Sequence, residues 1–119
     1  MTRRDPVRER RFLADAARGH EPFVEQATAR LNAGEQIYGD AWIWIGLRRH
    51  LAELLEEAAD LGSWAALASQ ALDREPNLSD TDRERVVAVL AATARHGARA
   101  HALLTAATST LGTEARTWH

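Results

Sequence analysis

Cysteine is missing from this 119-residue chain, so the chain forms no disulfide and offers no thiolate to a metal ion. Lysine is missing too, and the fifteen basic residues are all arginine. No apolar run approaches the roughly 20 residues that a membrane-spanning helix needs, and the N-terminus lacks the apolar stretch of a signal peptide. We therefore expect a cytoplasmic protein with no membrane contact.

Proline and glycine are scarce, with 3 and 7 residues, and most of them separate periodic segments. Alanine is abundant and β-branched residues are sparse, which favours helix over strand. The net charge of -2 produces no basic field, which argues against nucleic acid as a partner. Because 45% of the residues are hydrophobic, residues 1–119 can form one all-α domain with its own core.

Two helices are expected in the first third of the chain. Asp5 precedes a proline, which is typical of an N-cap, and a short helix with a frayed start runs within residues 1–19. A second helix begins at Glu21 and should stop at residues 32–34, where Asn and Gly occur together. The apolar segment 42–45 has no partner strand, so we interpret it as a buried connector.

The remaining residues predict two longer helices. Apolar residues at steps of three and four mark the core face of the third: Leu47, Leu51, Leu54, Ala58, Leu61, Ala65, Ala68 and Leu72. The fourth helix begins after Ser79 or Thr81, with Thr81 and Glu84 forming a capping box, and reaches about residue 108. Its core face includes Val87, Leu90, Ala94, Ala98, His101 and Thr105. Residues 109–119 form a loose tail. We expect an antiparallel helical bundle of about four helices that oligomerises.

The third helix carries a cluster of four carboxylates, Glu53, Glu56, Glu57 and Asp60. At about 100° per residue they fall within an arc of roughly 100°. Like charges at these spacings repel, and only Arg49, one turn earlier, is placed to offset them. A divalent cation such as Mg²⁺ would remove the repulsion, because it prefers carboxylate oxygens. The plain alternative is a solvated acidic face that pairs with arginines of other helices.

Trp64 extends the acidic face and favours the metal-site interpretation. A solvated face should continue with polar residues, whereas an aromatic ring beside carboxylates is typical of a pocket for a base or ring. The alternative for Trp64 is an anchor in the core or at a subunit interface.

Three segments of the chain resemble a known family. Residues 29–35, 38–42 and 53–64 look like the short MazG-like proteins of phages and actinobacteria, which belong to the all-α nucleoside triphosphate pyrophosphohydrolases. The likeness covers roughly residues 23–72. The pair Glu57 and Asp60 fits the family's ExxD motif, whereas Glu53 and Glu56 fit only part of its EExxE motif. Here the two motifs abut on one helix instead of lying on successive helices, and the family's phosphate-binding lysines are missing.

The resemblance implies hydrolysis of a nucleoside triphosphate to the monophosphate and pyrophosphate. Mg²⁺ or Mn²⁺ would be held by all four carboxylates, with Glu53 or Glu57 as general base. Arg30, Arg48 or Arg49 would neutralise the phosphates, and Tyr38 or Trp64 would stack on the base. The family also implies a homodimer or homotetramer.

Two alternatives stay open. Arg95 and His101 match the loose Arg-to-His spacing of HEPN ribonucleases, which are also all-helical, although His101 falls on the apolar stripe of its helix. The chain could instead be a non-catalytic helical interaction module on the same scaffold. The abutting acidic motifs, the missing lysines and the Ala-rich stretches 65–71 and 88–94 favour that interpretation.

Overall fold

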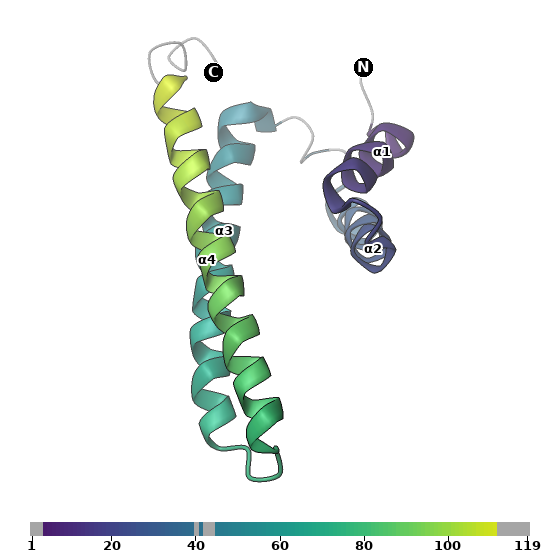
Figure 1. Ribbon diagram of the computed structural model, residues 1–119. Helices are drawn as coiled ribbons and strands as arrows, with labels where there is room; N and C mark the ends of the chain where they lie inside the picture. Colours follow the sequence, from purple (N-terminus) through teal and green to yellow (C-terminus); the bar gives the residue numbers. More distant parts are fainter. Residues whose placement is uncertain (1–3, 40, 42–44, 112–119) are drawn as a thin grey trace. The chain divides into compact units, whose positions relative to one another are not determined.

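The computed structural model describes residues 4–39, 41 and 45–111. Those residues form four helices and no strand: α1 (Pro6–Ala17), α2 (Glu21–Tyr38), α3 (Gly46–Asp73) and α4 (Asp80–Thr110) (Figure 1). The expected all-α class is confirmed. The chain divides into two compact units, Met1–Gly46 with α1 and α2, and Leu47–His119 with α3 and α4.

The first unit is a pair of short helices. Asp5 caps α1 as predicted, since its side chain accepts a hydrogen bond from the Arg8 N–H at 3.1 Å. Arg18 and Gly19 then take positive φ angles of 49° and 87°, which end α1 and reverse the chain. Val24 at the start of α2 is buried and is 1% exposed.

The predicted end of the second helix is wrong. α2 continues through Gly34 to Tyr38 and ends at Gly39, whose φ is 60° and whose N–H donates to the Glu35 carbonyl at 2.8 Å. A glycine inside a helix costs only about 1 kcal/mol, so Gly34 weakens α2 without ending it. Gly39 can end the helix because it adopts a φ that side chains disfavour.

In the second unit, α3 and α4 fold back on each other as a long hairpin (Figure 1). Ser79, one of the two predicted caps, accepts from the Asp82 N–H at 3.1 Å and begins α4. The guanidinium of Arg83 closes the turn by donating to the carbonyls of Leu72 at 2.6 Å and Glu75 at 2.7 Å. These bonds satisfy carbonyl groups that the end of a helix leaves without partners.

The two helices of the hairpin approach each other closely at Gly97. A Cβ atom at this position would lie 2.8 Å from the Ala58 carbonyl oxygen and 3.5 Å from the Gly62 nitrogen. Gly97 is buried in α4, as Ala58 is in α3. The backbones therefore touch here because neither helix has a large side chain between them.

The predicted core stripe of α3 is only partly buried. Ala58, Ala65 and Leu72 are 6–7% exposed, and Leu51 and Ala68 are intermediate. Three other stripe residues remain 42–49% exposed: Leu47, Leu54 and Leu61. A single partner helix covers only a narrow strip, so the rest of the apolar arc stays open.

Two predictions lie mostly outside the described residues. Ile45 of the expected buried connector is described and is 42% exposed, and residues 109–110 of the expected loose tail still belong to α4. The expected connector includes Trp42, Ile43 and Trp44, and the expected tail includes residues 112–119. Of the helices that the structure describes, none is both long and apolar enough to cross a membrane.

Candidate functional site

The predicted metal ligands lie along one exposed face of α3. Glu53 is partly buried, and Glu56, Glu57 and Asp60 are exposed. Arg49 pairs with Glu53 one turn away, with a guanidinium-to-carboxylate distance of 3.0 Å, as predicted. Within the described part of the chain, the other three carboxylates form no ion pair. Among the described residues, the face therefore carries three carboxylates without an ion-pair partner.

The described residues contain no group of three or more His, Asp or Glu side chains arranged to hold a metal ion. The helix geometry explains this, because residues three or four apart have Cβ atoms about 5–6 Å apart on a convex surface. A Mg²⁺ ion needs its oxygen ligands at about 2.1 Å. Ligands from outside this face would have to complete any site on it.

The predicted substrate-binding residues are divided between the two units. Arg30 and Tyr38 belong to α2 in the first unit and are exposed, Tyr38 at 62%. Arg49 and Trp64 belong to α3 in the second unit, where the Trp64 side chain is 71% exposed. Trp64 is therefore not a core anchor within its own hairpin. Its ring is available to a partner molecule.

The two residues of the ribonuclease motif do not lie on a common surface of α4. Arg95 and His101 are six residues apart in α4, which turns them about 120° away from each other. His101 was expected on the core face but is exposed, with its Nδ1 3.5 Å from the Thr105 hydroxyl of the next turn. Small neighbours leave this part of the interface open, so the imidazole reaches solvent.

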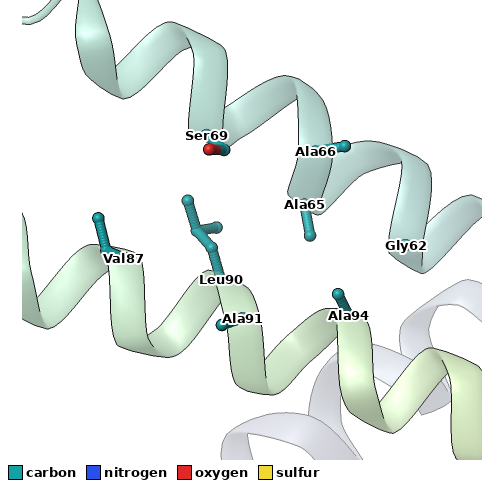
Figure 2. A pocket seen from close by; sticks show the side chains of 8 residues that line it. All are labelled: Gly62, Ala65, Ala66, Ser69, Val87, Leu90, Ala91 and Ala94. Atoms are coloured by element: carbon teal, nitrogen blue, oxygen red, sulfur yellow. The ribbon is translucent and has the colours of Figure 1, made fainter.

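Two connected grooves run along one edge of the hairpin. The first has a volume of about 240 Å³ and is lined by α3 and α4 residues that are mostly small (Figure 2): Gly62, Ala65, Ala66, Ser69, Val87, Leu90, Ala91 and Ala94. The second, of about 350 Å³, continues from Gly62 and Ala94 to Ala59, Ala98 and His101. Neither groove is lined by a predicted carboxylate. Both are shallow, apolar depressions without convergent polar groups.

The opposite edge of the hairpin carries large apolar side chains, of which Trp64 alone was predicted as a possible anchor at a subunit interface. We call it the open apolar face and define it by Leu54, Leu61, Trp64, Val89 and Leu103. Their exposed fractions are 49%, 42%, 71%, 62% and 60%.

The positions of these residues follow from the helical repeat. Relative to Ala58, Leu61 is turned about 60° to one side, and the groove residue Ala66 about 80° to the other. Relative to Gly97, Leu103 is turned about 120° to the open side, and Ala98 about 100° to the groove side. A surplus of alternating apolar residues over what one hairpin partner can cover was the signal in the sequence.

No protein-family model, no curated protein and no solved structure matches the chain. The likeness to MazG-like proteins therefore rests on the three sequence segments alone.

Proposed function

We propose that this chain is a helical association module that joins polypeptide chains through the open apolar face of the α3–α4 hairpin. The observation that supports this most strongly is the exposure of Leu54 and Leu61, which belong to the periodic stripe of α3 but are 49% and 42% exposed. Periodic leucines of this kind are ordinarily buried against a second helical surface.

The energetics favour association over exposure. Burying apolar surface contributes about 25 cal/mol per Å². The described hairpin buries only three of its hydrophobic side chains to below a tenth of their surface, namely Ala58, Ala65 and Leu72, and two of these are alanines. In helices of this type most stability comes from packing of the apolar face, so a partner that covers Leu54, Leu61 and Trp64 would stabilise the module.

A matched pair of valines on α4 tests this function. Val89 belongs to the open apolar face and is 62% exposed, whereas Val87 lines the groove on the opposite edge and is 52% exposed. We expect the full chain to sediment above its monomer mass. Val89→Asp should shift it to the monomer with its helical circular dichroism retained, and Val87→Asp should not. A monomeric parent chain, or equal effects of the two substitutions, would overturn the proposal.

A second candidate is a Mg²⁺- or Mn²⁺-dependent nucleoside triphosphate pyrophosphohydrolase. It is favoured by the three unpaired carboxylates on α3, Glu56, Glu57 and Asp60, with the exposed Trp64 ring beside them. In this proposal Glu53 and Glu57 serve catalysis, Arg30, Arg49 and Tyr38 bind substrate, and a homodimer or homotetramer, built as an antiparallel bundle, completes the metal site.

Metal-dependent stability separates the two candidates. A cation that binds only the folded chain raises its melting temperature by mass action. The pyrophosphohydrolase proposal expects such a shift with Mg²⁺ or Mn²⁺, pyrophosphate release from a nucleoside triphosphate, and loss of both in Glu57→Gln/Asp60→Asn. If the parent chain shows neither a shift nor pyrophosphate release, the association module stands without catalysis.

A further inference from the structure

The open apolar face is bordered by charges of opposite sign on its two helices. Asp60 follows Ala58 by two residues in α3, and Arg99 follows Gly97 by two residues in α4. Because Ala58 and Gly97 face each other in the hairpin, Asp60 and Arg99 are both turned about 160° from that contact, toward the open side. The two charged residues thus have equivalent angular positions about their helix axes, and both are exposed.

The acidic and basic borders also overlap in height along the hairpin. The contacts proceed in reverse order, from Arg83 with Leu72 at the turn to Gly97 with Ala58 further along. Continuing this order places Asp60 level with Arg95 and Arg99 level with Glu56, so Asp60 and Arg99 are offset along the hairpin by about one helical turn. The hairpin therefore presents apolar residues between an acidic edge and a basic edge that overlap in height.

We infer that the occupant of this face is a second copy of the chain, docked about a two-fold axis parallel to the helices. This inference rests on the proposed association function and specifies its partner. Rotation about such an axis leaves every residue at the same position along the helix direction. It places α3 of one copy over α4 of the other. Asp60 then lies on the same rim as Arg99 of the partner copy, offset along the axis by about one helical turn, roughly 6 Å. The pair occurs twice because a two-fold interface is isologous.

Charge complementarity identifies the second copy as the occupant. If two copies met with α3 on α3 and α4 on α4, borders of like charge would repel each other. If α3 of one copy meets α4 of the other, the acidic and basic borders attract each other. Leu54, Leu61 and Leu103 lie between the two borders, so the same arrangement buries them. Complementary charges at the rim of an apolar interface set the register and exclude other arrangements.

Single charge reversals provide the first half of the test. Asp60→Arg places two cations together in each symmetric contact, and Arg99→Asp places two anions together. We expect each full-length variant to raise the dimer dissociation constant by about tenfold or more, measured by sedimentation equilibrium. Glu84→Arg is the control, because Glu84 is exposed about 140° to the groove side of Gly97 and should leave the constant unchanged.

Mixing the two single variants provides the decisive half. In a mixed dimer Asp60→Arg faces Arg99→Asp on one side, and the native Arg99 faces the native Asp60 on the other, so both contacts attract. We expect equimolar mixing to restore dimers, and the double variant in one chain to dimerise with itself. If the double variant dimerises but the mixture does not, the charges act within one chain and the inference is overturned.

Different experimental results would overturn the two-fold pairing and the proposed association function. Dimers that dissociate on Val89→Asp but tolerate both charge reversals would leave the association module intact and overturn the two-fold pairing. A parent chain that is monomeric throughout would overturn both. Association of the reversed variants only in the mixture would confirm both.

Discussion

The two helix pairs of this chain are held together in different ways. α1 and α2 are linked mainly by charged side chains: Arg4 bonds to Glu9, Asn32, Glu35 and the Leu31 carbonyl, and Arg10 bonds to Glu21 and Glu25. α3 and α4 are held by backbone approach at Gly97 and by small apolar residues. The first pair uses polar contacts at its edges, and the second uses close packing along its length.

The difference has a consequence for how each pair responds to change. Ion pairs at the surface tolerate rearrangement and contribute modestly, typically 0–1 kcal/mol. A backbone contact leaves no room for any added atom, because protein interiors are close-packed. We therefore expect the hairpin to be sensitive to volume, and the α1–α2 pair to be sensitive to charge.

Gly97→Ala should have the largest effect. The added methyl group meets the Ala58 carbonyl at 2.8 Å, so the helices must separate. Overpacking costs about 1–3 kcal/mol, which outweighs the gain of up to about 1 kcal/mol that alanine brings in helix propensity. Denaturant unfolding followed by circular dichroism should show a lower stability. Gly62→Ala is the matched control, since nothing lies within 4 Å of its added Cβ, and it should raise the stability.

Arg4→Ala should have an intermediate effect confined to the α1–α2 pair. The Arg4 side chain is 5% exposed, and its hydrogen bonds join the start of α1 to the end of α2. Hydrogen bonds to charged groups contribute about 1–3 kcal/mol, so amide hydrogen exchange in α1 should accelerate clearly. Arg11→Ala, an exposed position within α1, should leave the exchange unchanged. Equal acceleration in both variants would contradict the role of Arg4.

Acidification should have the smallest effect. The hydrogen bond from Arg10 lowers the pKa of Glu25, helped by a hydrogen bond with Glu21. A lowered folded-state pKa means that the contribution is present above the unfolded pKa of about 4.3 and is lost as the pH falls through the lower folded value. The protection of amides at the start of α2, measured relative to the intrinsic exchange rate at each pH, should therefore fall slightly below pH 4, and Glu25→Gln should remove that dependence. A pH response retained in the variant would assign the effect to another carboxylate.

Several local features were predictable because they depend on neighbouring residues alone. The cap at Asp5, the start of α2 at Glu21 and the cap at Ser79 each follow from short patterns. The end of α2 was not predictable in the same way, because Gly34 and Gly39 are both plausible stops. Arg4 bonds to Leu31, Asn32 and Glu35 at the end of α2, and this contact between distant residues accompanies a helix that continues past Gly34.

The sequence by itself determined the helices and the apolar arc of α3, since both arise from the period of 3.6 residues. Only the tertiary structure decided which part of that arc is buried. Gly97 allows α4 to approach Ala58 so closely that one strip is covered and Leu54, Leu61 and Trp64 are left on the open side. Burial depends on which surfaces meet, and periodicity along one helix carries no information about its partner.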